Sequence, residues 1–264
     1  MTNSDFHLQV TAAPTVEDYD PEWLKDHLEH ERHANSLLSE VREAVFGAQD
    51  GLISTLAVVS TVGGATGQVF PVLVAGLASA LAGIFSMSAG EYMSTKSQRE
   101  IFDAQIAQEL LEVTERPGEA EAEVAYMLEE EGLSPESARR VAVELASNKG
   151  VLLKTMVEKE LGLAVDNDGN PMRGALVMGG SFGLASLVPI LPYLLVSVGS
   201  ALYVSVALTA LTLFGMGVLK SRWTRRHWFP SGLEVFALGA FAGVAGYLFG
   251  TVLPAALGVA GVSS

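Results

Sequence analysis

The chain contains no cysteine among its 264 residues. Disulfide bonds, thiolate metal ligands and cysteine redox pairs are therefore excluded. Basic residues are also scarce, because 16 lysines and arginines stand against 30 aspartates and glutamates. The resulting net charge of −14 argues against nucleic-acid binding, which needs a basic face, and is compatible with cation binding. The N-terminal residues do not resemble a secretory signal. The sequence contains no hydrolase motif, so we expect that the protein is not an enzyme.

Long apolar runs are what the sequence has in abundance. Asp, Glu, Lys and Arg are missing from residues 51–90, 174–219 and 235–264. Because a membrane-spanning helix needs about 20 apolar residues, the first two runs each have room for two spans and the third for one. We therefore predict an all-α, polytopic membrane protein. Its five transmembrane helices are expected at about 43–62, 70–93, 173–194, 198–219 and 232–255.

The remaining residues form three polar or terminal parts. These are an N-terminal segment (1–42), a helical insert between spans two and three (94–172) and a short tail (256–264). Three lysines or arginines precede the first span, eight lie in the insert, Arg173 opens the third span and four lie within 220–226. The positive-inside rule then places the N-terminus, the insert and the 220–230 loop in the cytoplasm. An odd number of spans puts the C-terminus on the other side.

The insert is expected to contain three or four helices. The second span continues to about Glu115, where Pro117–Gly118 ends it. Further helices are predicted at about 119–131, from Ser134–Pro135 to Ser147, and at 151–161, with Asn148–Gly150 as a helix end. The connector Asp166–Pro171 resembles a calcium loop only superficially, because the glutamate at the twelfth position is missing.

Two carboxylates, Asp50 and Glu91, fall inside or at the edge of the predicted spans. Acids in a membrane are energetically costly, so both are candidates for a functional site. Met87 and Glu91 are four residues apart on one helix face, and Met87 lies at a depth similar to that of Asp50. Oxygen and soft sulfur together suit Fe²⁺ better than Mg²⁺ or Ca²⁺. The alternatives are core packing for Met87 and a water-facing position for Glu91.

Carboxylates also recur at helical spacing in the insert, where pairs three or four residues apart can bind one ion together. They are Glu109, Glu112, Glu119, Glu121 and Glu123, followed by Met156 with Glu160. A solvated acidic helix face is the alternative interpretation. His27, His30 and His33 form another set of possible ligands, although we favour an amphipathic surface helix for that segment.

Two long motifs resemble one known family. Residues 42–55, REAVFGAQDGLIST, resemble the first-span signature of the vacuolar iron transporter family, and residues 86–100, SMSAGEYMSTKSQRE, resemble its second-span signature. The runs 132–134 and 158–163 look like parts of that family's cytoplasmic insert. The similarity covers about residues 35–255.

The resemblance implies a homodimer with its transport pathway at the dimer interface and a cytoplasmic metal-binding domain between spans two and three. It also implies proton-coupled export of Fe²⁺ from the cytoplasm, into a vacuole or out of the cell. By similarity, Asp50 and Met87 match pathway metal ligands, and Glu43 matches an acid near the cytoplasmic entrance. The insert's metal-binding positions are matched by Glu109, Glu112, Glu123, Met156 and Glu160.

This sequence departs from the family pattern at three positions. Ser79 stands where members often carry a glutamate, which leaves Asp50 and Glu91 as candidates for proton coupling. Tyr126 and Val157 stand where a second acid and a second methionine occur.

The expected partners are divalent metal ions, protons and membrane lipid, with no permanently bound cofactor. The expected location is the plasma membrane of a prokaryote or the vacuolar membrane of a eukaryote. A Mn²⁺ transporter of the same type is one alternative function. A membrane-anchored metal sensor or buffer without transport is the other.

Overall fold

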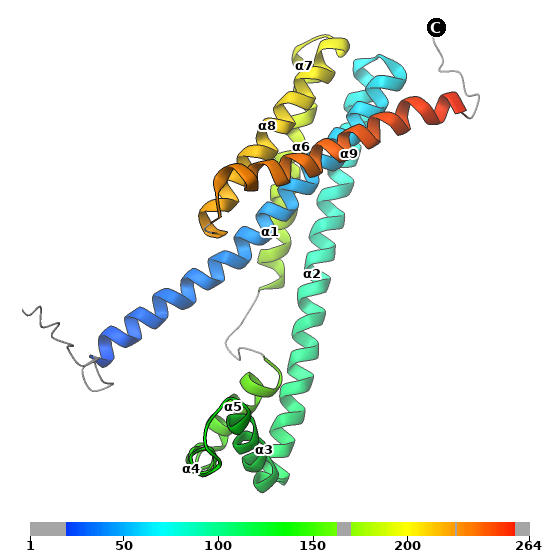
Figure 1. Ribbon diagram of the computed structural model, residues 1–264. Helices are drawn as coiled ribbons and strands as arrows, with labels where there is room; N and C mark the ends of the chain where they lie inside the picture. Colours follow the sequence, from blue (N-terminus) through cyan, green and yellow to red (C-terminus); the bar gives the residue numbers. More distant parts are fainter. Residues whose placement is uncertain (1–19, 163–169, 225, 257–264) are drawn as a thin grey trace, which may run out of the picture. The chain divides into compact units, whose positions relative to one another are not determined.

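The computed structural model describes residues 20–162, 170–224 and 226–256, and the regular secondary structure within them is helix, joined by short turns (Figure 1). This confirms the predicted all-α class. In chain order the helices are α1 (Pro21–Thr66), α2 (Val69–Glu115), α3 (Pro117–Glu130), α4 (Pro135–Ala146), α5 (Lys149–Glu160), α6 (Pro171–Ile190), α7 (Pro192–Leu195), α8 (Val198–Thr224) and α9 (Trp228–Ala256). The chain divides into two compact units, residues 1–43 and 44–264.

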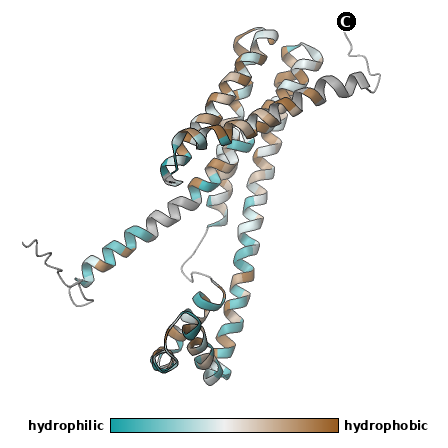
Figure 2. Ribbon diagram, viewed as in Figure 1, coloured by the Kyte–Doolittle hydropathy of each residue, from teal (hydrophilic) through white to brown (hydrophobic). Residues whose placement is uncertain are grey.

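Four of the described helices are long and apolar enough to cross a membrane. They are Glu40–Thr66 within α1, Val69–Glu115, Pro171–Ile190 and Val198–Arg222 within α8. Figure 2 shows hydrophobic colour along α6 and α8, whereas the second half of α2 is largely hydrophilic. The fifth predicted span corresponds to α9, a helix of 29 residues whose sequence carries one charge, Glu234. The membrane crossing of α9 stays a prediction, and the tail from residue 257 lies outside the described residues.

The helices of the spans approach one another through glycine. A Cβ atom on Gly51 of α1 would overlap the backbone carbonyl oxygen of Phe182 on α6, and one on Gly179 of α6 would overlap the Ser88 side chain on α2. Buried hydroxyls add interhelical hydrogen bonds. The Ser205 hydroxyl of α8, for example, donates to the Pro189 carbonyl at 2.8 Å. Small residues and hydroxyl groups of this kind are what hold helices together where lipid surrounds them.

The turns between the spans lie close to the expected span boundaries. The chain reverses between α1 and α2 at Gly67, whose φ of 62° favours glycine. The third predicted span is divided into α6, which contains Pro189, and the short α7, which begins at Pro192. The connector at 163–169 lies outside the described residues.

The insert consists of the second half of α2 together with α3, α4 and α5. With 47 residues, α2 measures about 70 Å, more than twice the apolar thickness of a bilayer. Its last turns therefore lie outside the membrane-spanning segment and pack on the other insert helices. The core that they share is composed of Val113, Ala120, Val124, Ala125, Leu128, Ala138, Ala142, Leu152 and Met156.

Side-chain caps set the helix starts within the insert. The Ser134 hydroxyl accepts a hydrogen bond from the Ser137 amide at 3.3 Å, as the sequence predicted. The helix before Asn148 ends at Ala146, close to the predicted end, but α5 begins at Lys149, two residues earlier than predicted. The side chain of Asn148 accepts hydrogen bonds from the Gly150 and Val151 amides at 2.9 and 3.3 Å, so Asn148 is the N-cap of α5. An asparagine suits either role, and only the following backbone decides between them.

Candidate metal site

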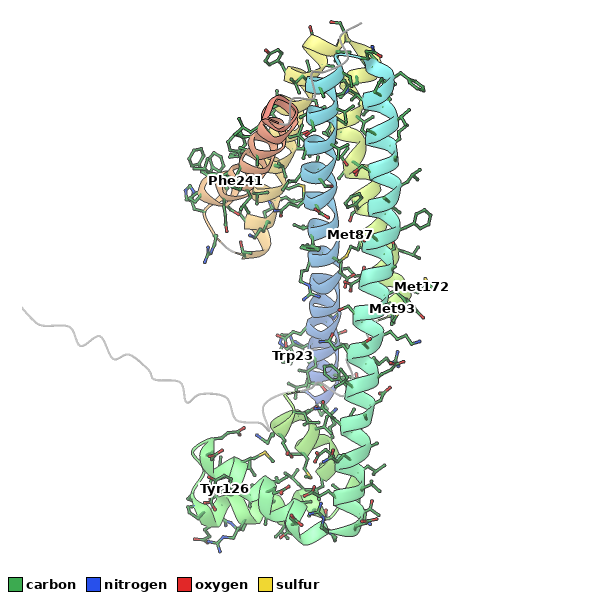
Figure 3. The ribbon with its side chains drawn as sticks, turned by 90° about the vertical axis from the view of Figure 1, so that its right-hand side faces the viewer. Trp23, Met87, Met93, Tyr126, Met172 and Phe241 are labelled. Carbon is green, nitrogen blue, oxygen red and sulfur yellow. The ribbon has the colours of Figure 1, made fainter. Side chains whose placement is uncertain are left out.

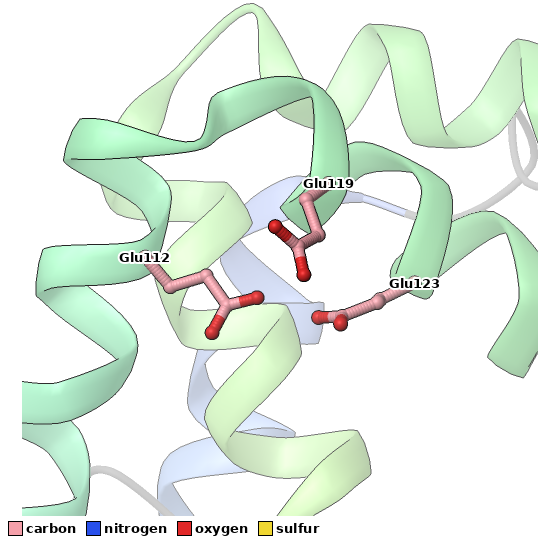
Figure 4. Close-up of side chains that lie close together, drawn as sticks. All are labelled: Glu112, Glu119 and Glu123. Carbon is pink, nitrogen blue, oxygen red and sulfur yellow. The ribbon is translucent and has the colours of Figure 1, made fainter.

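Three carboxylates converge where α2 meets α3. One oxygen each of Glu112, Glu119 and Glu123 lies within 4.8 Å of the others. Figure 4 shows Glu112 reaching across from α2 toward Glu119 and Glu123, which share one face of α3. Among the described residues, this is the one group of three or more His, Cys, Asp or Glu side chains with that spacing. A divalent ion could bind all three carboxylates at once.

The convergence depends on the sharp corner at Arg116. This residue is the C-cap of α2 and the N-cap of α3, with φ of −130° and ψ of 52°. Pro117 then occupies the first position of α3, where its fixed φ suits a helix start and its missing N–H removes no helical hydrogen bond. Because the chain turns at a single residue, the last turn of α2 and the first turns of α3 face each other.

The electrostatics of the cluster favour a cation. Burial, the charge of Glu112 and a hydrogen bond with it raise the pKa of Glu123 to about 7, with smaller effects of Glu160 and Glu119. Burial and then the charges of Glu160 and Glu112 raise the pKa of Glu109 above its ordinary value. Carboxylates from α2, α3 and α5 therefore act on one another. A divalent ion would relieve this mutual repulsion.

Glu109, three residues before Glu112 on α2, is a buried acid that interacts electrostatically with Glu112. It is 6% exposed, and its Oε2 atom has no hydrogen-bond partner among the described residues. A buried carboxylate oxygen without a partner is costly unless a cation or a donor satisfies it. Glu109 therefore fits the role of a metal ligand on the inner side of the cluster.

Met156 lies in the hydrophobic core of the insert rather than on its surface. It is fully buried and packs in the same cluster as Val113, Val124 and Leu152. The sequence prediction counted its sulfur among the metal ligands. The structure shows a packing role for Met156, and the ligand role stays a prediction.

Four of the five predicted insert positions thus share one electrostatic neighbourhood: Glu109, Glu112, Glu123 and Glu160. Glu119 was noted in the acidic run but was not assigned to the site. Its spacing of four residues from Glu123, on the same helix, was the signal that could have identified it. Tyr126, which stands where a second acid was expected, is 62% exposed on the surface of the insert (Figure 3).

The candidate residues in the spans lie on α1 and α2. Asp50 is half-buried, and the Ser54 hydroxyl donates to its backbone carbonyl at 2.7 Å. Met87 is half-buried on α2 (Figure 3), as is Glu91, whose Oε1 accepts a hydrogen bond from the Thr95 hydroxyl at 2.8 Å. Glu43 is 8% exposed. The roles of these residues as pathway ligands stay predictions.

The histidines of α1 contact neighbours on their own helix. The His27 ring stacks on Trp23 with ring centroids 4.9 Å apart, and its Nε2 lies 3.4 Å from Glu31. His30 Nδ1 lies 2.8 Å from the Asp26 carbonyl oxygen. The side chain of His33 lies outside the described residues. These contacts fit the interpretation of an amphipathic surface helix.

Comparison with known proteins points to one group. The model of the VIT family matches residues 41–251. Vacuolar iron transporter 1 of Oryza sativa subsp. japonica is 32% identical over 222 residues, which cover 84% of this chain and 88% of that protein. Vacuolar iron transporter 2 of the same species is 34% identical over 212 residues, or 78% of this chain and 85% of that protein. The vacuolar iron transporter of Plasmodium falciparum (isolate 3D7) is 28% identical over 235 residues, or 85% of this chain and 86% of that protein.

Proposed function

The chain belongs to the VIT family, and from this premise we propose that it is an integral membrane transporter of divalent iron. It moves Fe²⁺ out of the cytoplasm in exchange for protons. The named relatives support iron as the cargo, and the apolar helices support a membrane location. The observation that carries the proposal is the carboxylate cluster of Glu112, Glu119 and Glu123, with the buried Glu109 beside it.

The insert collects the ion at the cytoplasmic face. Carboxylate oxygens from α2 and α3 replace part of the ion's water shell, and their mutual repulsion falls when the ion is bound. Because the cluster lies at the surface end of α2, the ion needs no passage through apolar surroundings to reach it. Binding there raises the local concentration of Fe²⁺ on the cytoplasmic side of the protein.

The second site lies in the spans and uses Asp50 and Met87 from both subunits of a homodimer. Glu43 and Glu91 line the approach to it. Protons that enter from the opposite side compete for the Asp50 carboxylate and release the metal, which couples the two flows. An acid set inside a span has no purpose in a simple anchor, because its burial in lipid is unfavourable.

The test is uptake of Fe²⁺ into proteoliposomes with an imposed pH gradient. Asp50→Ala is expected to abolish uptake, because the proton and the metal lose their common ligand. Glu119→Gln is expected to lower uptake several-fold at limiting iron and little at saturation, since it weakens collection but leaves the pathway intact. Glu121→Gln, on the same helix but outside the cluster, is the matched control and should behave as the unaltered protein.

The same assay separates the alternative functions. A Mn²⁺ flux equal to that of Fe²⁺, together with inhibition of Fe²⁺ uptake by Mn²⁺, would support a manganese transporter, since carboxylate oxygens accept both ions. Divalent binding without any flux would instead identify a metal sensor or buffer anchored by its spans. Normal Fe²⁺ uptake by the Asp50→Ala protein would exclude the proposed pathway.

A further inference from the structure

Arg116, at the corner between α2 and α3, is held by its backbone. Its N–H donates to the Glu112 carbonyl at 2.8 Å, and its own carbonyl accepts from the Glu119 and Ala120 amides at 2.9 and 3.2 Å. These bonds close the end of α2 and the start of α3 without help from the side chain. A substitution of the side chain therefore changes the charge at the corner more than its fold.

The side chain of Arg116 lies against two of the three converging carboxylates. Its Nη1 donates to Glu119 Oε2 at 2.7 Å, and its Nη2 donates to Glu112 Oε2 at 3.3 Å. The guanidinium thus bridges α2 and α3 across the corner. Other cations of the insert are bonded elsewhere: Arg139 donates to the Pro135 carbonyl at 3.1 Å, and Lys159 donates to Glu131 Oε1 at 2.7 Å.

A separate observation shows that this guanidinium leaves the cluster incompletely neutralised. Glu109 Oε2 is buried and has no hydrogen-bond partner among the described residues. The charges of Glu112 and Glu160 act on the same carboxyl group. Arg116 therefore bonds to Glu112 and Glu119, while the buried oxygen of Glu109 has neither a cation nor a donor among the described residues.

We propose that Arg116 is an internal competitor of the transported ion, which must displace the guanidinium from Glu112 and Glu119 before it can bind. This inference rests on the proposed function of the cluster as a collecting site. The guanidinium thereby weakens the binding of the ion to the cluster and speeds its release. A site that passes an ion onward has to bind it well enough to capture it and weakly enough to release it. A guanidinium suits this role because it keeps its charge at every physiological pH.

The first experiment is calorimetric titration of the full-length protein in detergent with Mn²⁺, which is stable in air, and with Fe²⁺ under nitrogen. Arg116→Gln is expected to bind both ions about tenfold more tightly, because a positive charge beside the ion is removed. Arg116→Lys should restore the dissociation constant to within about threefold of that of the unaltered protein. Lysine returns the positive charge but cannot hydrogen-bond to both glutamates through a planar guanidinium. Arg139→Gln is the matched control and should leave the affinity unchanged.

A structural role for Arg116 predicts the opposite result. If the side chain mainly holds the corner, Arg116→Gln should bind metal more weakly and unfold at a lower temperature. Unchanged or weaker binding by a folded Arg116→Gln protein would overturn the inference. Failure of the unaltered protein to bind any divalent ion would instead overturn the proposed function itself.

A second measurement needs no substitution. Phenylglyoxal modifies arginine, and mass spectrometry locates the modified residues. Saturation with Mn²⁺ is expected to speed the modification of Arg116 several-fold, because the displaced guanidinium loses its carboxylate partners, while Arg139 stays unchanged. Protection of Arg116 by the metal would contradict the inference even if Arg116→Gln did not fold.

Discussion

The insert and the membrane helices are built from the same kind of element but bury different side chains. The insert has an apolar core, in which Val113, Val124 and Met156 are fully buried. The spans also have apolar clusters, around Val59 and around Leu52, but they expose large apolar side chains, such as Phe70 at 77% and Phe85 at 73%, and they bury hydroxyl groups as well. Thr55, Ser186, Ser205 and Thr209 are all fully buried within them.

The difference follows from the solvent that each region meets. Water drives apolar side chains of the insert together, whereas lipid offers apolar side chains no such advantage. Beside their apolar clusters, the spans therefore depend on close backbone approach and on interhelical hydrogen bonds such as that from Ser205 to the Pro189 carbonyl. The insert gains enough from its apolar core to tolerate several repelling carboxylates at one corner. Changes in the two regions should accordingly have different consequences.

The largest effect is expected from the core of the insert. Met156→Ala should destabilise it by about 2–5 kcal/mol, because it removes a fully buried side chain and leaves a cavity. Hydrogen exchange followed by mass spectrometry should show loss of protection in α3 to α5 while the spans stay protected. Equal loss in the spans would contradict the separation of the two regions.

Met156→Leu sharpens the same test. Leucine conserves the volume, so the stability should change by less than about 1.5 kcal/mol. If the sulfur is a metal ligand, Fe²⁺ affinity should nevertheless fall several-fold, whereas an unchanged affinity would leave Met156 with packing as its sole role.

A smaller effect is expected from a single methyl group in the spans. Gly51→Ala should destabilise the membrane helices by about 1–3 kcal/mol, because the new Cβ would overlap the Phe182 carbonyl oxygen and force α1 from α6. Gly118→Ala in the insert meets no atom within 4 Å and should stay within about 0.5 kcal/mol. Denaturation of the full chain in mixed micelles measures both. Similar stabilities of the two variants would show that close glycine packing does not hold the spans together.

The smallest expected effect is a pair of opposite pH trends at the carboxylate corner. The pKa of Glu123 is raised from 4.5 to about 7, so the folded protein binds this proton more tightly than the unfolded chain does. The contribution of Glu123 to stability without metal is therefore greatest in acid and is lost as the pH rises from about 4.5 through 7.

Metal affinity should change in the other direction, because binding needs the carboxylate deprotonated. Mn²⁺ affinity should rise by up to about tenfold per pH unit below 7 and then level off. Glu123→Gln should reduce the pH dependence of both the stability and the Mn²⁺ affinity. Calorimetric titration measures the affinity, and hydrogen exchange, corrected for the pH dependence of its intrinsic rate, measures the stability. A Glu123→Gln protein with an unaltered pH profile would assign the titration to another group.

Much of the architecture could be predicted from the sequence. The charge-free runs indicated the apolar helices, and Pro117 and Ser134 marked a helix break and a helix start close to where they occur. These features depend on composition and on local backbone chemistry, which a sequence displays directly. The start of α5 was predicted two residues late, because the N-cap function of Asn148 becomes visible only when the helix that follows it is known.

The carboxylate cluster could be predicted only in part. Glu109 and Glu112 share a face of one helix, and Glu119 and Glu123 share a face of another, so periodicity relates the members within each pair. Periodicity does not continue through a corner. The contact of Glu112 with Glu119, and the position of Arg116 between them, depends on backbone angles at one residue.

The sequence by itself thus determined that the chain is helical, apolar in long runs and acidic between them, because these properties reside in residue types and their spacing. Tertiary structure alone decided which acids form one cluster, that Glu109 has a buried oxygen without a partner, and that Met156 lies in a core. The physical reason is that charge repulsion, burial and ion pairing depend on distance in space. Across the turn, that distance is set by the backbone angles of Arg116 together with the packing of α3 and α5 against α2.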